Sequence, residues 1–251
     1  DSLVLVVTTD RTSNSPVLTY PSGTASGGAP LQEHWFFDNI RADPWAGRSM
    51  LETAERVAAE AGYTRQQIDE ITVTRYVQYT AALANDAAFQ RRYLVPVEVP
   101  GRRGTKTVVD GDVGVRETTT EGLAKLDAVL PDGVVTHGAQ THPADGTAGM
   151  VVTSTRRARE LARGGAVARI LATGTARAAA SEMPKAPVPA AERALADAGL
   201  TFDDVTAVTM HNPFAVNDLW FSERTGIAPE RVNQYGSSLI FGHPQGPTGA
   251  R

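Results

Sequence analysis

The sequence predicts an α/β protein in which strands and helices alternate and pack in mainly parallel layers. Short apolar runs recur along the chain, and Leu3–Thr8, Ala166–Ala172 and Val205–Met210 are typical of strands. Between them lie stretches that begin with capping residues and end at glycine, as helices do. Such alternation favours parallel layers, and these sheets bind ligands at the ends of their strands. We therefore expect the functional loops to follow strands.

The composition is that of a globular protein and argues against several classes of partner. The chain has 251 residues, of which 41% are hydrophobic and 21% charged, enough for one large domain or two smaller ones. The net charge of -4 offers no basic stripe for nucleic acid, and no run approaches the roughly 18 to 20 apolar residues of a membrane helix. Since no signal peptide is visible, we expect a cytoplasmic protein.

The first part of the chain contains two apolar runs that predict strands. Leu3–Thr8 has the composition of a strand covered on both faces, so we expect further chain before it. Gly146–Val152 is the second such run. Asp10–Pro30, rich in Ser, Thr, Gly and Pro, predicts a loop that leaves the sheet.

Helix boundaries are marked by capping residues and glycines. Ser49–Glu52 is a capping box for a helix that ends at Ala61, and Thr64–Gln67 begins a second helical stretch that reaches towards Tyr93. Further helices are expected from Ser154 to Arg163 before Gly164, from Ala190 to Ala198 before Gly199, and from Asn217–Asp218 to Thr225 before Gly226.

The closing run Gly242–Arg251, G-H-P-Q-G-P-T-G-A-R, is the strongest candidate for a site. Glycine permits backbone angles closed to other residues and proline fixes φ, so this run predicts a rigid loop that presents His243. Tyr235–Phe241 predicts a short strand leading into it. An ordinary tight turn remains the alternative, because Gly-Pro punctuation marks turns far more often than catalytic loops.

The G-H-P-Q-G run resembles the G-H-P-x-G motif of the thiolases, a family of acyl-CoA acyltransferases. The run H-N-P-F-A at 211–215 is similar to the family's N-E-A-F-A segment. Other segments that agree in order are T-A-E-R-V-A at 53–58, V-P-V-E-V-P-G-R-R-G at 95–104, R-E-T-T-T-E-G-L-A-K-L at 116–126 and T-H-G-A-Q-T-H-P-A-D-G at 136–146. Asn212 in place of the family's glutamate and Ala144 in place of its asparagine leave the substrate class open.

The resemblance implies a thiolase-like layered αβαβα fold of two related halves, with an inserted loop domain that binds coenzyme A. The implied division assigns residues 1–10 and 143–164 to the N-terminal half, 11–142 to the loop domain and 165–251 to an incomplete C-terminal half. Thiolases cleave a 3-ketoacyl-CoA with CoA or run the reverse Claisen condensation. Coenzyme A would be a substrate, with no covalently bound cofactor and no metal.

The absence of cysteine conflicts with thiolase chemistry as it stands, because the family uses one cysteine as acyl-accepting nucleophile and usually a second as acid and base. The chain has no cysteine. We therefore expect the nucleophile outside the 251 residues, a chain cut at both ends, and no thiolysis by these residues alone. Serine is a weak substitute without a dedicated base, and no such arrangement is evident around Ser237 or Ser238.

The resemblance also implies roles for individual residues. His243 would accept the proton of the nucleophile and hydrogen-bond the thioester oxygen, His211 would help order an oxyanion hole, and Asn212 would hold His211 or a water. Without the resemblance, Arg116 would be taken as a solvated surface charge. The implied coenzyme A contacts are Arg116 at the nucleotide end, Met50, Leu126 and Thr141 along the pantetheine arm, and Phe214.

The other histidines carry weaker signals. His34, beside two aromatic residues, is most simply a packing or surface residue. His137 and His142 are spaced at i and i+5, but only Asp145 is available to extend a metal ligand set, so proximity to bound CoA is the better interpretation of His142.

Three functions remain open from the sequence. The first is an acyl-CoA acyltransferase of lipid metabolism, acting as a homodimer or tetramer. The H-N-P-F-A and G-H-P-Q-G motifs resemble those of a divergent branch of the family more than those of the commonest members. That resemblance implies bulky or aromatic acyl-CoA substrates and a small zinc-ribbon and OB-fold partner subunit. The others are a thiolase-fold aldolase or lyase acting on a CoA ester, and a non-catalytic acyl-CoA- or lipid-binding protein. A cysteine in the flanking sequence would discriminate among them.

Overall fold

A computed structural model describes residues 2–21 and 27–251. The chain divides into two compact units, which are described separately. Unit 1 comprises Asp1–Arg56, Pro143–Leu200 and Pro244–Arg251, and unit 2 comprises Val57–His142 and Thr201–His243. No helix among the described residues is long and apolar enough to cross a membrane.

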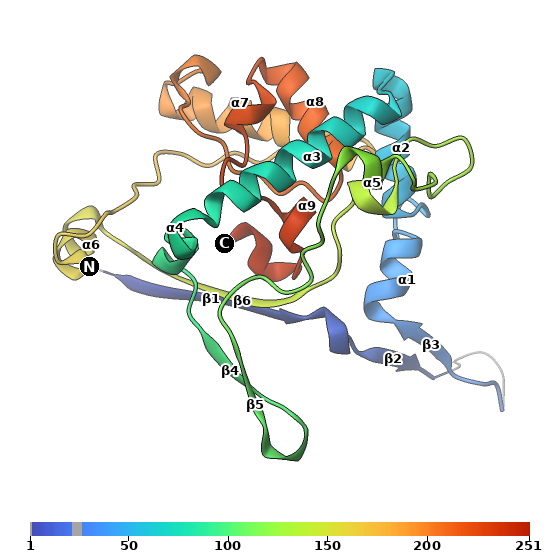
Figure 1. The fold of residues 1–251 in the computed structure, drawn as a ribbon, viewed down its shortest axis with the longest axis horizontal. Helices are drawn as coiled ribbons and strands as arrows, with labels where there is room; N and C mark the ends of the chain where they lie inside the picture. Colours follow the sequence, from blue (N-terminus) through green and yellow to red (C-terminus); the bar gives the residue numbers. More distant parts are fainter. Residues whose placement is uncertain (1, 22–26) are drawn as a thin grey trace. The chain divides into compact units, whose positions relative to one another are not determined.

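Unit 1 is built on a two-stranded antiparallel sheet. β1 (Leu3–Arg11) pairs with β6 (Asp145–Thr153) along its whole length, from Leu3 opposite Thr153 to Arg11 opposite Asp145 (Figure 1). The unit also contains β2 (Val17–Tyr20), β3 (Leu31–His34), α1 (Trp35–Arg41), α6 (Thr155–Ala162) and α7 (Pro187–Ala198). β2 and β3 also pair antiparallel.

The prediction that Leu3–Thr8 is a buried strand is half right. The segment is a strand, but Leu3, Leu5 and Val7 are each more than half exposed. Among the described residues β1 pairs with β6 alone, and apolar side chains on both faces of this sheet, such as Val4 and Leu5, are at least half exposed. The β-branched residues of this run favour an extended backbone. Burial of their side chains depends on other segments packing against the sheet, which the composition of the run does not determine.

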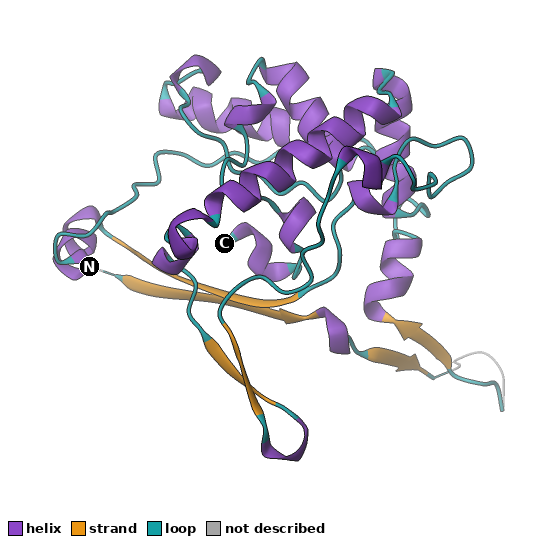
Figure 2. Cartoon of the chain, in the orientation of Figure 1, coloured by secondary structure: helices purple, strands orange, loops and turns teal. Residues whose placement is uncertain are grey.

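Unit 2 is mainly helical (Figure 2). Its helices are α3 (Arg65–Ala82), α4 (Ala84–Ala87), α5 (Thr120–Leu123), α8 (Ala215–Thr225) and α9 (Ser238–Phe241), and β4 (Val97–Pro100) and β5 (Lys106–Val109) form an antiparallel hairpin. α3 contacts α5, α8 and α9. Residues that these elements bury together include Ile68, Ile71, Tyr79, Leu123, Trp220, Phe221, Leu239 and Ile240. α2 (Met50–Ala61) contains the boundary between the units.

Helix starts and stops follow the sequence signals closely. The amide of Ser49 donates to Glu52 and the amide of Glu52 donates to Ser49 Oγ, which is the reciprocal capping box expected before α2. Thr64 and Gln67 cap α3 in the same way, but α3 ends at Ala82 rather than continuing towards Tyr93. The glycines after α2, α7 and α8, Gly62, Gly199 and Gly226, all have positive φ.

Three predicted strands are not strands in the structure. Ala166–Ala172 and Val205–Met210 lie in loops (Figure 2), and a single parallel bridge from Val208 to Val232 is all the pairing that either segment has. The three sheets among the described residues are antiparallel pairs, not the parallel layers expected from alternation. An apolar run forms a strand only where a neighbouring strand satisfies its backbone hydrogen bonds.

The third correction concerns the lead into the G-H-P-Q-G run. Tyr235–Phe241 contains the helical turn α9 instead of a strand, with the amides of Ile240 and Phe241 donating to the carbonyl of Ser237. A short apolar run does not distinguish strand from buried helix by periodicity, so this segment was ambiguous from its sequence. In the predicted loop Asp10–Pro30, β2 is a strand, and residues 22–26 lie outside the described residues.

Candidate functional site

Two histidines from separate segments of unit 2 lie face to face. The imidazole rings of His211 and His243 stack with centroids 4.2 Å apart and planes inclined by 28°. His211 precedes α8, and His243 follows α9 through Gly242, whose φ of 95° is a conformation that L side chains rarely adopt. The structure thus brings together the two histidines that the sequence proposed as catalytic.

The surroundings of His211 favour its neutral form. Burial, followed by the charge of the neighbouring His243, lowers the pKa of His211 to about 4. The residue as a whole is exposed, but its ring is partly desolvated, because His243 covers one face and Ser238 contacts Nδ1. His211 is therefore uncharged near neutral pH.

The hydroxyl of Ser238 contacts both His211 and the next residue, Asn212. Its Oγ lies 2.7 Å from Nδ1 of His211 and 3.2 Å from both the backbone nitrogen and Oδ1 of Asn212. Ser238 is only 2% exposed. Oδ1 of Asn212 also accepts a hydrogen bond of 3.3 Å from the amide of Leu239. These contacts join α9 to the segment that carries His211.

A buried ion pair supports Asn212 from the other side. Nδ2 of Asn212 donates to Oδ2 of Asp218 at 2.6 Å, and Oδ1 of Asp218 lies 2.8 Å from Nη2 of Arg75. Both charged side chains are fully buried. Burial raises the pKa of Asp218, and the Arg75 guanidinium opposes that rise. Arg75 also donates to the carbonyls of Pro229 and Val232, so few of its donors lack partners.

Hydrogen bonds join the Thr141–His142 segment to both histidine-bearing segments of the site. The amide of His243 donates to the carbonyl of His142 at 2.9 Å. The amide of Thr141 donates to the carbonyl of Pro213, and its hydroxyl donates to the carbonyl of Ser238 at 2.5 Å. Nε2 of His142 is buried and has no hydrogen-bond partner among the described residues. Burial, followed by the charge of Arg116, lowers the pKa of His142.

The residues expected to contact coenzyme A differ in exposure and in the unit to which they belong. Arg116 is exposed, and its positive charge contributes to the lowered pKa of His142. Leu126 is 38% exposed and packs beside Gly138, so closely that a Cβ added to this glycine would come within 3.0 Å of Cδ1 of Leu126. Phe214 is 7% exposed and bridges Gln140, so it packs the site more than it faces a ligand. Met50 begins α2 and belongs to unit 1, whereas the other expected contacts belong to unit 2.

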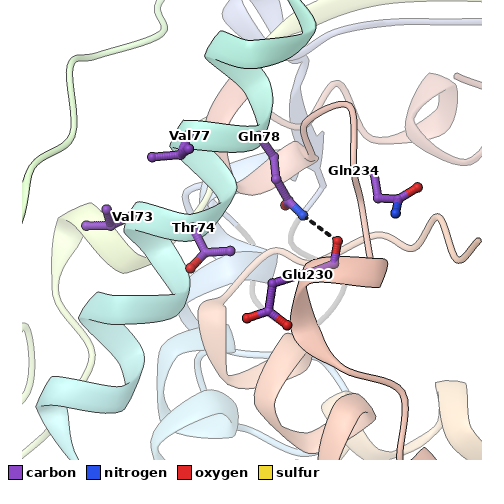
Figure 3. A pocket seen from close by; sticks show the side chains of 6 residues that line it. All are labelled: Val73, Thr74, Val77, Gln78, Glu230 and Gln234. Atoms are coloured by element: carbon purple, nitrogen blue, oxygen red, sulfur yellow. Dashed lines mark hydrogen bonds between the residues drawn. The ribbon is translucent and has the colours of Figure 1, made fainter.

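Unit 2 also contains a pocket whose lining includes neither histidine. Its volume is about 460 Å³, and it is lined by residues of α3 and of the 230–234 segment, namely Val73, Thr74, Val77, Gln78, Glu230 and Gln234 (Figure 3). Gln78 donates to the carbonyl of Glu230 across it. None of the predicted site residues lines this pocket, and its lining holds no pair of groups suited to acyl transfer. The stacked imidazoles of His211 and His243, in contrast, can exchange protons and donate hydrogen bonds.

Sequence reasoning missed three polar residues of the site. Arg75, Asp218 and Ser238 come from α3, α8 and α9, and nothing in their local sequence marks them as neighbours. Asp218 was expected to cap α8, but it lies inside the first turn and pairs with Arg75. The one signal in the sequence was the position of Asp218, an acidic residue that closely follows the H-N-P-F-A run and could therefore have been expected near the site.

The sequence showed no sign of a base around Ser238, but in the structure Nδ1 of His211 lies 2.7 Å from its hydroxyl. The hydroxyl is nonetheless buried and surrounded by protein groups, so a substrate carbonyl cannot reach it. The geometry favours His211 and His243 as the groups that would face a ligand. Among the described residues, no three His, Asp or Glu side chains cluster closely enough to hold a metal ion.

Curated relatives of the chain are named as acetyl-CoA acetyltransferases or as ketoacyl-CoA thiolases. The chain is 33% identical over 228 residues to an acetyl-CoA acetyltransferase of Synechocystis sp., a match that covers 89% of this chain and 56% of the relative. It is 34% identical over 222 residues to a beta-ketoadipyl-CoA thiolase of Acinetobacter baylyi, covering 86% and 55%. The chain therefore spans little more than half the length of these relatives.

Solved structures give the same result for the fold. The human mitochondrial 3-ketoacyl-CoA thiolase superposes with a TM-score of 0.88 at 27% identity, covering 99% of this chain and 63% of that one. A structure of the same human protein in complex with CoA gives a TM-score of 0.87 at 26% identity, covering 99% and 62%. The fold class expected from the resemblance, that of a thiolase, is confirmed.

Family models account for nearly all of the sequence. The family described as thiolase, N-terminal domain, matches residues 5–156, which is more than half of the chain. The family described as thiolase, C-terminal domain, matches residues 165–251. With the stacked histidines of the H-N-P-F-A and G-H-P-Q-G runs, these matches show that the chain belongs to the thiolase family.

Proposed function

We propose that the protein of which this chain forms part is an acyl-CoA acyltransferase of the thiolase type. It would cleave a 3-ketoacyl-CoA with CoA or run the reverse condensation. The observation that carries the proposal is the stacking of His211 on His243, in a chain whose relatives are acetyl-CoA acetyltransferases and ketoacyl-CoA thiolases. These two imidazoles supply the acid, base and hydrogen-bond donors that the reaction needs at the thioester.

The reaction also needs a thiolate to carry the acyl group, and the 251 residues contain no cysteine. We propose that a cysteine outside these residues is the nucleophile and that His243 accepts its proton. His211 is neutral near pH 7, so it would act as a hydrogen-bond donor to a thioester oxygen and not as a cation. On this proposal the 251 residues alone would not perform thiolysis.

Coenzyme A binding is assigned to the segment 11–142, which we propose to be the loop domain, with 1–10 and 143–164 in the N-terminal half and 165–251 in the C-terminal half. Arg116 would meet the phosphates at the nucleotide end, since it is exposed and cationic. Leu126 and Thr141 would line the pantetheine arm, together with Met50. Phe214 would support this arm by packing under it.

We further propose that the protein is cytoplasmic, takes part in lipid metabolism and forms a homodimer or tetramer. A small zinc-ribbon and OB-fold subunit is the partner that we propose for it. The names of the relatives include both acetyl and larger ketoacyl substrates, so the assay below grades the length of the acyl group.

The proposed function is tested with the intact protein, 3-ketoacyl-CoA substrates of graded acyl length, and free CoA. We expect loss of the 3-ketoacyl-CoA that depends on added CoA and yields two acyl-CoA products, identified by mass spectrometry. Turnover without CoA, giving a free aldehyde or ketone, would indicate the aldolase or lyase alternative. Binding of acyl-CoA without any turnover would indicate a binding protein.

A further inference from the structure

The single hydroxyl proton of Ser238 decides which nitrogen of His211 carries a proton. Ser238 Oγ is close to two groups that can accept a hydrogen bond, Nδ1 of His211 at 2.7 Å and Oδ1 of Asn212 at 3.2 Å. It can donate to only one of them. If it donates to His211, Nδ1 is an acceptor and the neutral ring has its proton on Nε2. If it donates to Asn212, His211 must donate from Nδ1.

The distances favour donation to His211. Hydrogen bonds of the O–H···O type span about 2.5 to 3.0 Å, and the contact to Asn212 Oδ1 lies beyond that range. The contact to His211 is the shortest that Ser238 Oγ makes. Asn212 Oδ1 keeps a donor, although a long one, because the backbone N–H of Leu239 points at it from 3.3 Å. Both acceptors near Ser238 Oγ therefore keep a donor when Ser238 donates to the histidine.

The orientation of the Asn212 amide is itself fixed. Its Nδ2 donates to Asp218, whose carboxylate is held by the fully buried guanidinium of Arg75. Arginine stays protonated in proteins, so the pair keeps Asp218 as an acceptor. Asn212 therefore turns its NH₂ to Asp218 and its oxygen to α9, which leaves Ser238 with one acceptor at good distance, His211 Nδ1.

We propose that Ser238 is a positioning residue that holds His211 in the tautomer with its proton on Nε2. Ser238 occupies Nδ1 of His211, and the residue is exposed, so Nε2 is the ring nitrogen that can offer its N–H to a ligand. For acyl transfer, the Nε2–H would donate to the thioester oxygen as it becomes anionic. That catalytic consequence rests on the proposed function, whereas the tautomer rests on the geometry alone.

The tautomer is measured directly by two-dimensional ¹H–¹⁵N multiple-bond NMR of the unmodified intact protein, labelled with ¹⁵N-histidine, at neutral pH. The His211 signals are identified by their loss in His211→Gln. We expect Nε2 to show the chemical shift of a protonated imidazole nitrogen and Nδ1 that of an unprotonated one. The reverse assignment overturns the proposal, and no variant of Ser238 is needed to reach this result.

The role of the hydroxyl is tested with Ser238→Ala and the matched variant Ser237→Ala. Ser237 is the preceding residue and equally buried, and its Oγ has no hydrogen-bond partner among the described residues. Ser238→Ala should shift the His211 signals towards a mixture of tautomers and lower kcat by about tenfold with little change in KM, part of the effect of losing an oxyanion donor. Ser238→Thr, which keeps the hydroxyl, should restore the wild-type signals.

The outcomes separate the two claims. If Ser238→Ala and Ser237→Ala leave the His211 signals equally unchanged, Ser238 does not set the tautomer and the proposal fails. If the signals change but kcat falls no further than in Ser237→Ala, the positioning role in catalysis fails. If the intact wild-type protein has no CoA-dependent turnover, the proposed function fails, and the NMR result still decides the tautomer.

Discussion

His211 and His243 stack with their ring centroids 4.2 Å apart, although 31 residues separate them in the sequence and each is held by different neighbours. His211 is tied to Ser238 through Nδ1, and His243 is tied to the carbonyl of His142 through its amide. Two imidazoles in contact disfavour double protonation, because each positive charge would repel the other. The arrangement therefore keeps at least one ring neutral, which suits a hydrogen-bond donor paired with a base.

Replacing His243 by alanine should lower the turnover number of the intact protein by at least ~10²-fold, the scale of losing a general base or an oxyanion donor. His211→Ala should cost somewhat less. The measurement is steady-state cleavage of a 3-ketoacyl-CoA by CoA. His137→Ala is the matched control, because His137 is exposed and contacts only Gln140 among the contacts described. Wild-type rates in His243→Ala would show that the G-H-P-Q-G run is only a turn.

Arg116→Glu should weaken coenzyme A binding, because it replaces an exposed cation with an anion near the expected phosphates. It should also raise the pKa of His142, since the Arg116 charge now helps to lower it. Isothermal titration with CoA gives the affinity, and Arg102→Glu in the turn after β4 carries the same charge change as a control. Equal affinities for the two variants would remove Arg116 from the site.

Arg75→Met should destabilise the fold by roughly 3–5 kcal/mol, because it leaves the carboxylate of Asp218 buried without its cation. The double variant Arg75→Met with Asp218→Leu should recover much of this loss. Lys106→Met breaks an exposed pair with Glu98 and should cost about 0–1 kcal/mol. Urea unfolding measures all three. A similar loss in Arg75→Met and Lys106→Met would contradict the account of the buried pair.

The stability of the fold should decline on acidification partly through His211. Its pKa is about 4 in the folded protein and about 6.5 in the unfolded chain, so between these values the unfolded state binds more protons. The free energy of unfolding contributed by this group is therefore fully present above pH ~6.5 and is lost as pH falls towards 4. Urea midpoints across this range should fall less steeply for His211→Gln than for wild type. Parallel slopes would show that His211 has an ordinary pKa.

The sequence by itself determined the local features of this protein. Capping boxes at Ser49 and Thr64 and glycines after α2, α7 and α8 placed helix ends correctly, because caps satisfy backbone groups within a few residues. The H-N-P-F-A and G-H-P-Q-G runs identified both histidines and the family, since such motifs are contiguous.

Only the tertiary structure decided pairing and burial. Leu3–Thr8 is a strand with exposed apolar side chains, and Tyr235–Phe241 became a helical turn, because both outcomes depend on partners far along the chain. A network of side-chain contacts, from Arg75 through Asp218 and Asn212 to Ser238, joins α3, α8 and α9. No local pattern encodes it, because a hydrogen bond between distant segments exists only once packing has excluded water and brought its donor and acceptor together.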